Sequence, residues 1–275
     1  MSPNREFLNP KLIDDLTFLV SRAAAEIMRI QRSSPSTRQK SDGTPVTAAD
    51  QASEAILLEG LTQLLPGIPV ISEEAGGPTP AAGSTFVLVD PLDGTREFVA
   101  GRDEFTINLA VITDGSPLAG LIAAPAQKRL WRAIAGQGAE RLQLAPGAPP
   151  AGAECVPIRT RKTERGQLIA LVSRSHADAA TEAFLARFTN VKKIARGSAI
   201  KFCRLAEGEA DIYPRLGPTS EWDVAAGDAL LSAAGGKVTD PQGAPLVYGR
   251  PGRNLCIPAF IAWGDPAMIE SVPGR

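Results

Sequence analysis

The chain has 275 residues, 44% of them apolar, and a formal net charge of −1. A chain of this length buries roughly three quarters of its unfolded surface, which is enough for one large domain or two smaller ones. The balanced charge argues against a nucleic-acid polymer or a membrane surface as the partner, while a small anionic substrate remains compatible with it.

The three cysteines, Cys155, Cys203 and Cys256, form no CxxC pair, and their odd number fits a reducing compartment better than a disulfide framework. The polar start leads into no apolar signal-peptide core, and no run approaches the ~20 apolar residues of a membrane span. We therefore expect a cytoplasmic enzyme or binding protein without a membrane span. Peripheral association with the inner membrane is left open.

The first part of the chain is predicted to contain two helices followed by strands. Asn9 caps the first helix, which ends near Ser33, and a polar loop is expected over 33–42. Thr47 starts the second helix, with Asp50 three residues later, as in a capping box. Strands are expected at 69–72, 86–89, 106–113, 119–124 and 129–135, with a hairpin turn at 114–117.

The stretch 145–153 is almost entirely Ala, Pro and Gly, which favours a domain boundary or a crossover linker. We expect an N-terminal α+β half over 1–145 and a C-terminal α/β half over 154–275. The second half is predicted to contain strands at 168–172 and 260–263 and helices at 178–188, 198–207 and 222–234, the second of them capped by Ser198. The pattern indicates the mixed α/β class.

Carboxylates stand at the ends of regular elements in four places. They are Glu73 and Glu74 after one predicted strand, Asp90 and Asp93 after another, and Asp50 and Asp223 at helix starts. Clustered hard oxygen ligands select magnesium or manganese over zinc. Simpler roles remain open at single positions, because an aspartate at a helix start is more often a cap than a ligand and paired glutamates fit a solvated loop.

The string 90–95, Asp-Pro-Leu-Asp-Gly-Thr, is the most informative part of this set. Pro91 restricts the backbone, so the two aspartates can curl around a common point with the Leu92 carbonyl as a further ligand. Gly94 and Thr95 then supply backbone N–H groups in a tight turn that suits a phosphate oxygen. Phosphatases that form a phospho-aspartate carry Asp-x-Asp-Gly-Thr, and the additional residue here favours water held by a metal.

Strings along most of the chain resemble the inositol monophosphatase superfamily of lithium-sensitive, magnesium-dependent phosphatases. Within it, the details are similar to 3'(2'),5'-bisphosphate nucleotidases of the CysQ type. The matching strings are 42–50, 70–74, 90–98, 173–176, 197–202, 213–215 and 221–227, in the order of the family. The nucleotidase branch is suggested by Arg96-Glu97-Phe98, Ser173-Arg174-Ser175-His176 and Tyr213-Pro214-Arg215.

The resemblance implies a layered α/β/α/β/α sandwich of the inositol monophosphatase and fructose-1,6-bisphosphatase type, with the site between its two halves. It also implies two Mg²⁺ ions, and leaves a third, weaker ion open. The N-terminal half would carry most of the metal ligands, and the C-terminal half Asp223 and the nucleotide contacts. By motif match, the ligands are Glu73, Asp90 and the Leu92 carbonyl for the first ion, Asp90, Asp93 and Asp223 for the second, and Glu73 and Glu74 for the third.

The catalytic residues implied by the resemblance are Asp50, Glu73 and Thr95. The first ion would lower the pKa of a bound water, and Thr95 with Asp50 would take its proton. The second ion would neutralise the leaving oxygen of an in-line displacement.

The substrate implied is a small phosphorylated nucleotide, adenosine 3',5'-bisphosphate, which would be hydrolysed to AMP and phosphate in sulfur assimilation or nucleotide recycling. The substrate-binding residues implied are Gly94, Thr95, His176, Ser198, Lys201, Arg215 and Asp223. Lysine and arginine suit a group of charge near −2. A surface loop for His176 and a solvated helix face for Lys201 remain open.

Two other functions remain open. An inositol or sugar monophosphatase on the same scaffold would not need Lys201 and Arg215 for a second phosphate. A non-catalytic nucleotide or metal sensor would be marked by the loss of a ligand, and the sequence shows none lost. The resemblance leaves a homodimer open.

Overall fold

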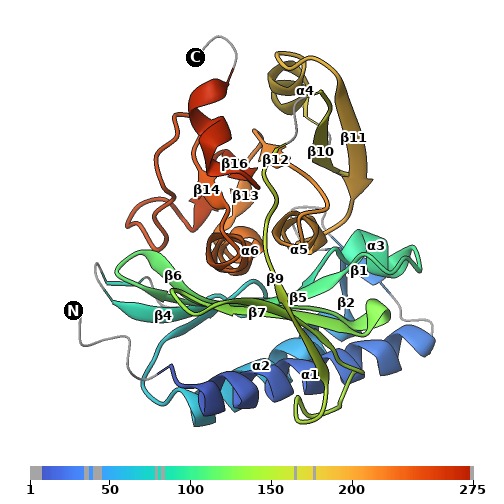
Figure 1. Cartoon of the computed structure of the whole chain (residues 1–275). Helices are drawn as coiled ribbons and strands as arrows, with labels where there is room; N and C mark the ends of the chain where they lie inside the picture. The colour runs from blue at the N-terminus through green and yellow to red at the C-terminus, as the bar shows by residue number, and fades with distance from the viewer. Residues whose placement is uncertain are drawn as a thin grey trace.

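The computed structural model describes residues 8–33, 37–39, 45–77, 80–81, 84–163, 166–175 and 178–272. Helices and sheets alternate in five layers (Figure 1). In order, the layers are α1 (Pro10–Arg32) with α2 (Ala48–Leu64), a seven-stranded sheet, α5 (Ile200–Ala206) with α6 (Glu221–Ala233), a five-stranded sheet, and α4 (Ala179–Leu185). The expected α/β/α/β/α sandwich is confirmed.

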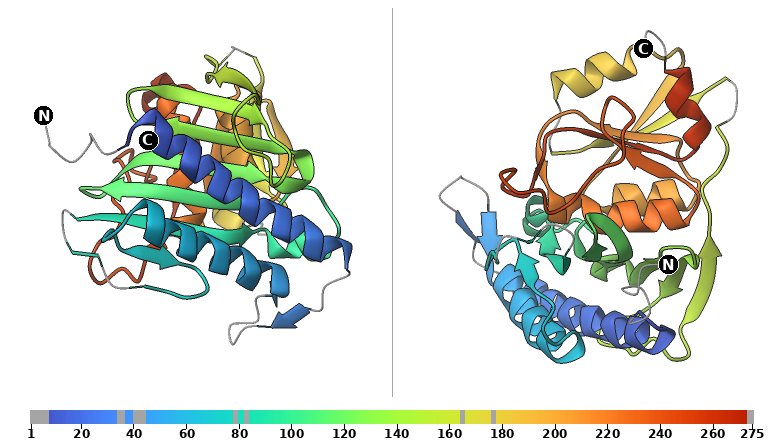
Figure 2. Two further views of the ribbon diagram at one scale, coloured as in Figure 1. Left: turned by 90° about the horizontal axis from the view of Figure 1, so that it is seen from below. Right: turned by 90° about the vertical axis from the view of Figure 1, so that its left-hand side faces the viewer.

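The outer helices α1 and α2 lie across one face of the seven-stranded sheet (Figure 2). The Asn9 side chain accepts a hydrogen bond from Leu12 N at 2.9 Å, so the expected cap of α1 is confirmed. Thr47 and Asp50 form the expected capping box at the start of α2. Among the described residues, no helix is long and apolar enough to cross a membrane.

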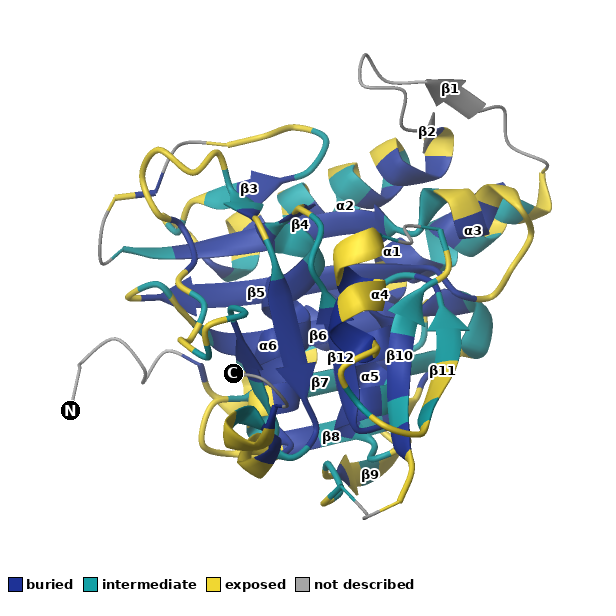
Figure 3. Ribbon diagram, turned by 90° about the horizontal axis from the view of Figure 1, so that it is seen from above, coloured by how far each residue is buried: buried dark blue, intermediate teal, exposed yellow. Residues whose placement is uncertain are grey.

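The seven-stranded sheet carries the N-terminal part of the site. Its spatial order is β3 (Val70–Ser72), β4 (Thr85–Asp93), β5 (Thr106–Thr113), β6 (Ser116–Ala124), β7 (Arg129–Ile134), β8 (Gly138–Gln143) and β9 (Glu154–Ile158). Only β3 and β4 are parallel. Every residue of β5 is buried, at the centre of the molecule (Figure 3). The predicted hairpin is confirmed with a shorter turn, because Asp114 and Gly115, both at positive φ, suffice to reverse the chain.

The five-stranded sheet has the order β11 (Val191–Arg196), β10 (Leu168–Ser173), β12 (Ile212–Arg215), β16 (Phe260–Trp263) and β14 (Lys237–Thr239). Its inner face packs on α5 and α6, where Tyr213 and Phe260 are buried. Its outer face packs on α4 and the 3₁₀ helix η3 (Pro266–Ser271), where Trp263 and Phe184 are buried. Helices therefore cover both faces of this sheet.

Short elements complete the fold. They are the paired strands β1 (Thr37–Gln39) and β2 (Pro45–Thr47), the paired strands β13 (Thr219–Ser220) and β15 (Cys256–Ile257), helix α3 (Thr95–Val99) and the 3₁₀ helix η2 (Pro125–Gln127). The prediction of a loop throughout 33–42 is wrong, because β1 lies inside this range and pairs with β2, which follows it.

The stretch 145–153 joins β8 to β9, and both strands belong to the first sheet. The chain passes to the second sheet after Ile158. The division into halves at 145 and 154 stays a prediction.

Candidate active site

A cavity of about 290 Å³ is lined by the end of β4, by α3, by the start of α6 and by residues around α5 and β12. Most of the predicted site residues line it, namely Glu73, Asp90, Leu92, Asp93, Gly94, Thr95, Ser198, Lys201, Arg215 and Asp223. Asp50 and Glu74 do not line this cavity. His176 lies outside the described residues.

Asp90, Asp93 and Asp223 form one side of the cavity, which we call the acidic wall. Its first two residues stand at the end of β4, which is longer than the predicted strand 86–89. Asp90 pairs with Asn108 and Asp93 pairs with Thr106, so β4 has one residue more than β5 between these pairs. Such a bulge bends the strand and changes the direction of its side chains. The curl is stabilised by Leu92 N, which donates to Asp90 Oδ1 at 3.0 Å.

Asp223 joins this wall from the second half of the chain. It is the third residue of α6 and accepts hydrogen bonds from Ser220 N, at 3.1 Å, and from the Thr219 hydroxyl. One carboxylate oxygen from each of Asp90, Asp93 and Asp223 lies within 4.8 Å of the others. The Asp223 side chain therefore both caps α6 and lines the cavity, so its capping role does not exclude metal binding.

The electrostatics of this cluster favour a cation. Burial and the neighbouring carboxylates of Glu73, Asp93 and Asp223 raise the pKa of Asp90 well above its ordinary value. Burial and Asp223 also raise the pKa of Asp93, to about 6, although Lys201 acts in the opposite direction. Buried carboxylates that repel one another are stabilised in their charged form by a divalent cation. The all-oxygen donor set fits magnesium.

Asp50 contacts the site through Thr95. Thr95 Oγ1 lies 3.2 Å from Asp50 Oδ1 and 3.2 Å from the Leu92 carbonyl oxygen, and it donates to them. Asp50 Oδ2 accepts from Thr47 N and Thr47 Oγ1, both at 2.7 Å. Burial raises the pKa of Asp50, despite these hydrogen bonds. The structure thus brings the two predicted proton acceptors into direct contact.

The opposite wall is cationic. Lys201 is only 2% exposed, so the solvated helix face left open for it is excluded. Its Nζ donates to the carbonyl oxygens of Ser198 at 2.6 Å and Arg196 at 3.3 Å, and burial lowers its pKa to about 8. Arg215 lies at the end of β12, where its Nη2 donates to the Pro218 carbonyl at 3.2 Å.

The predicted helix 198–207 is shorter than expected. Helix α5 starts at Ile200 with Ala199 as its cap, and Ser198 has a φ of 44°. The prediction that Ser198 caps this helix is therefore wrong. The left-handed backbone at Ser198 turns the chain between β11 and α5.

Several cavity residues were not assigned a role from the sequence. Glu97, Tyr213 and Trp222 line the cavity, and all three stand inside strings that carried the family resemblance. Glu104 contacts the same region without lining the cavity. An isolated glutamate before a strand gives no sequence signal of this kind.

A model of the inositol monophosphatase family matches residues 12–259. This chain belongs to the inositol monophosphatase family. The match spans the seven-stranded sheet, the five-stranded sheet except β16, and the residues of the acidic and cationic walls. It accounts for the layered fold.

Within the inositol monophosphatase family, nucleotidases resemble the chain over most of its length. The 3'(2'),5'-bisphosphate nucleotidase CysQ of Escherichia coli is 36% identical over 260 residues, which are 90% of this chain and 98% of that protein. The protein of the same name from Salmonella typhimurium is 38% identical over 235 residues, 81% of this chain and 86% of that protein. The crystal structure of CysQ from Bacteroides thetaiotaomicron has a TM-score of 0.75 and 32% identity, covering 92% of this chain and 96% of that one.

Proposed function

We propose that the chain is a magnesium-dependent 3'(2'),5'-bisphosphate nucleotidase, which hydrolyses adenosine 3',5'-bisphosphate to AMP and phosphate. The observation that carries this function is one cavity with an acidic wall, at Asp90, Asp93 and Asp223, and a cationic wall, at Lys201 and Arg215. The similarity to proteins named as nucleotidases supports the same substrate class. A monophosphatase needs the acidic wall alone.

The acidic wall is the proposed magnesium site. Asp90, Asp93 and Asp223 would hold two ions, with Glu73 and the Leu92 carbonyl as further ligands. Glu74, next to Glu73 in the turn after β3, is proposed to help hold a third ion. Bound magnesium supplies a Lewis acid that activates water and neutralises charge on the leaving oxygen.

Thr95 and Asp50 are proposed to move the proton of the attacking water. Thr95 Oγ1 accepts this proton and passes its own to Asp50 Oδ1, which lies 3.2 Å away. Asp50 Oδ2 is held by the Thr47 backbone and hydroxyl, so the accepting carboxylate is fixed before the reaction. Its raised pKa makes it a better proton acceptor than an exposed aspartate.

Substrate binding is proposed to be divided between the turn after β4 and the two cationic side chains on α5 and β12. The backbone at Gly94 and Thr95 is proposed to hold the departing phosphate, and Lys201 and Arg215 the phosphate that stays on the nucleoside. Two of the three Lys201 N–H donors are used by the carbonyls of Arg196 and Ser198, which leaves one for a phosphate oxygen. His176 and Ser198 stay proposed nucleotide contacts on the basis of the sequence strings.

The Arg215→Ala variant tests whether the cationic wall binds the phosphate that stays on the nucleoside. A charge-assisted hydrogen bond contributes about 1.5–3 kcal/mol, so kcat/KM for adenosine 3',5'-bisphosphate should fall roughly 10- to 100-fold. Turnover of inositol 1-phosphate, if detectable, should change little. The matched control is Arg204→Ala, which removes a half-buried arginine that does not line the cavity and should leave both activities near wild type. Equal losses on both substrates for Arg215→Ala would contradict the assignment.

A further inference from the structure

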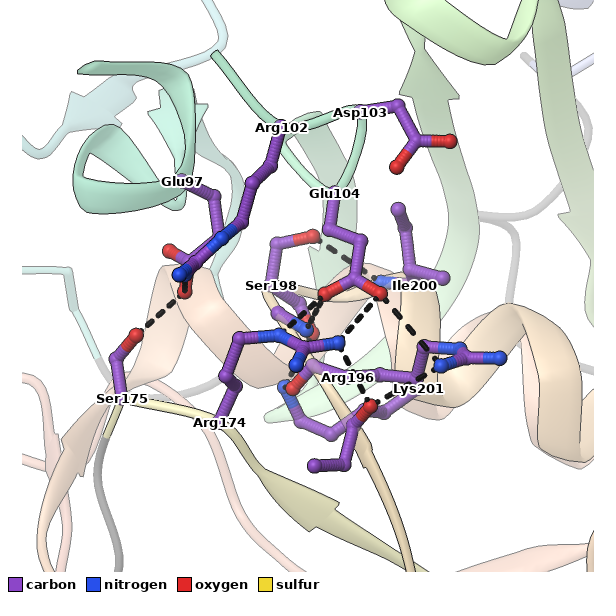
Figure 4. Close-up of polar contacts among 12 residues, drawn as sticks. Glu97, Arg102, Asp103, Glu104, Arg174, Ser175, Arg196, Ser198, Ile200 and Lys201 are labelled. Atoms are coloured by element: carbon purple, nitrogen blue, oxygen red, sulfur yellow. Dashed lines mark hydrogen bonds and ion pairs between the residues drawn. The ribbon is translucent and has the colours of Figure 1, made fainter. Parts of the chain in front are cut away.

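The turn Arg196–Ser198, between β11 and α5, is held from two sides by buried charges (Figure 4). Gly197 N donates to Glu104 Oε2 at 2.8 Å. From the other side, Lys201 Nζ donates to the carbonyl oxygens of Ser198 and Arg196. A carboxylate and an ammonium group thus bind the N–H and the carbonyls of the same short segment.

Glu104 joins the two halves of the chain at this point. It precedes β5 in the first sheet, is 8% exposed, and accepts from Arg174 Nε at 2.9 Å and Nη2 at 3.0 Å. Arg196 Nη1 lies 3.7 Å from Glu104 Oε1. Burial raises the pKa of Glu104, but Arg174 and the Gly197 N–H outweigh burial and hold the pKa below its ordinary value. Glu104 is therefore a charged, fully paired carboxylate.

The backbone around Glu104 also touches both turns of the cavity. A Cβ on Gly197 would lie 2.7 Å from the Glu104 carbonyl oxygen, and a Cβ on Gly94 would lie 3.1 Å from the same atom. Both turns therefore pack directly on Glu104, with no space for a side chain at Gly197. Glu104 therefore lies in contact with the turn that follows β4 and with the turn that precedes α5.

The turn delivers one hydrogen bond to the acidic wall. Ala199 N, two residues after Gly197, donates to Asp93 Oδ2 at 2.7 Å. Between them, Ser198 adopts a left-handed backbone that persists only where the surrounding structure holds it. Gly197 and the N–H that binds the Asp93 carboxylate are thus two residues apart in one short turn.

We infer that Glu104 is a positioning residue for the proposed metal site, because it anchors Gly197 and so presents Ala199 N–H to Asp93. The inference rests on the proposed function only in taking Asp93 as a ligand of magnesium. Partners that orient a ligating carboxylate usually change metal affinity when they are removed.

The test compares the direct binding of Mn²⁺, a magnesium substitute with a measurable spectrum, to the full chain without substrate. Glu104→Gln keeps the side-chain volume but replaces one carboxylate oxygen by an NH₂ donor, which faces either Arg174 Nη2 or the side shared by Arg174 Nε and Gly197 N. We expect its Kd for Mn²⁺ to rise about tenfold. Electron paramagnetic resonance of free Mn²⁺ measures the Kd, and thermal unfolding measures the accompanying loss of stability.

Asp211→Asn is the matched control. Asp211 is a fully buried carboxylate that pairs with Arg161 at 2.9 and 3.0 Å and accepts from Ile169 N at 2.7 Å. Like Glu104, it therefore combines an arginine held by two hydrogen bonds with one backbone N–H. It does not line the cavity. This variant should lose a comparable amount of thermal stability and keep the wild-type Kd for Mn²⁺.

Arg174→Gln gives a second, milder measurement, which decides the question if Glu104→Gln does not fold. It removes the hydrogen bonds from Arg174 that hold Glu104 but leaves the bond from Gly197 N to Glu104 in place. The Kd for Mn²⁺ should therefore rise less than in Glu104→Gln, by about threefold. A wild-type Kd in both variants, or an equal rise in Asp211→Asn, would overturn the positioning role. Failure of the nucleotidase assignment would instead appear as absent phosphate release by the wild type, with the Mn²⁺ comparison unaffected.

Discussion

Lys201 shows how a single residue combines burial with charge at this site. Its ammonium group is almost fully buried, which lowers its pKa to about 8, while Asp93 favours the charged form. The same pair lowers the cost of burying Asp93. A buried lysine needs such partners, because an unpaired buried charge is very costly. Lys201 therefore supports the acidic wall as well as the proposed phosphate site.

At the same scale, we predict that Asp93 makes the stability of the protein depend on pH and, as a proposed ligand, on magnesium. Its folded pKa of about 6 exceeds the ordinary 3.8, so between these values the folded chain holds a proton that the unfolded chain has released. Stability without metal should therefore fall as the pH rises through this window, by on the order of 1–3 kcal/mol. At neutral pH, magnesium should restore it. Denaturant unfolding with magnesium and with a chelator measures both effects.

The Asp93→Asn variant isolates this residue from other carboxylates, such as Asp228, whose pKa burial also raises to about 6. With a chelator at neutral pH, the variant should be more stable than the wild type, because one repelling charge is gone. With magnesium it should lose both the stabilisation and the phosphate release. A variant that keeps near wild-type phosphate release would show that Asp93 is not a ligand.

At the scale of elements, the contact between β6 and α6 fixes the position of Asp223. A Cβ on Gly120 in β6 would lie 2.5 Å from the Ala226 carbonyl oxygen and 2.8 Å from Ala229 Cβ in α6. Gly120→Ala should therefore push α6 from the sheet and lower the free energy of unfolding by about 1–3 kcal/mol. Because α6 begins two residues before Asp223, phosphate release should also fall.

Denaturant unfolding checks the stability, and Gly217→Ala is the control. Gly217 has no neighbouring atom closer than 3.7 Å to an added Cβ, and its φ is not in the left-handed region. This variant should change the free energy of unfolding by much less. If both variants unfold at the same denaturant concentration as the wild type, the sheet and α6 are not packed as closely as described.

Elements with strong local signals were predictable from the sequence. Capped helices such as α1, α2 and α6, and the hairpin of β5 and β6, are confirmed with small shifts of their ends. The strands β1, β2, β8, β9, β11, β12, β13, β14 and β15 were missed. Strands such as β11, with two exposed lysines, have little apolar periodicity and are formed because a neighbouring strand pairs with them.

The acidic wall could be predicted because its residues stand in contiguous strings, of which 90–95 holds most. The structure adds what a string does not contain, such as the bulge at the end of β4 and the hydrogen bond from Ala199 to Asp93. Glu104 was missed because its role depends on partners about 70 and 93 positions away, Arg174 and Gly197. The cytoplasmic location and the homodimer stay predictions.

At the scale of the whole molecule, the cavity lies where the two sheets and the helices between them meet. The first sheet supplies Asp90 and Asp93, and the second part of the chain supplies Asp223, Lys201 and Arg215. We propose that the two halves expected from the sequence each contribute one wall. A site built this way is complete only when both halves are folded and in contact.

The most direct test of the nucleotidase assignment is phosphate release by the wild-type enzyme with magnesium. It compares adenosine 3',5'-bisphosphate with its sulfated form, inositol 1-phosphate and fructose 1,6-bisphosphate at equal concentrations. The two walls predict the highest kcat/KM for a nucleotide that carries two separate anionic groups, and loss of release when a chelator removes magnesium. Faster release from inositol 1-phosphate than from adenosine 3',5'-bisphosphate would contradict the assignment.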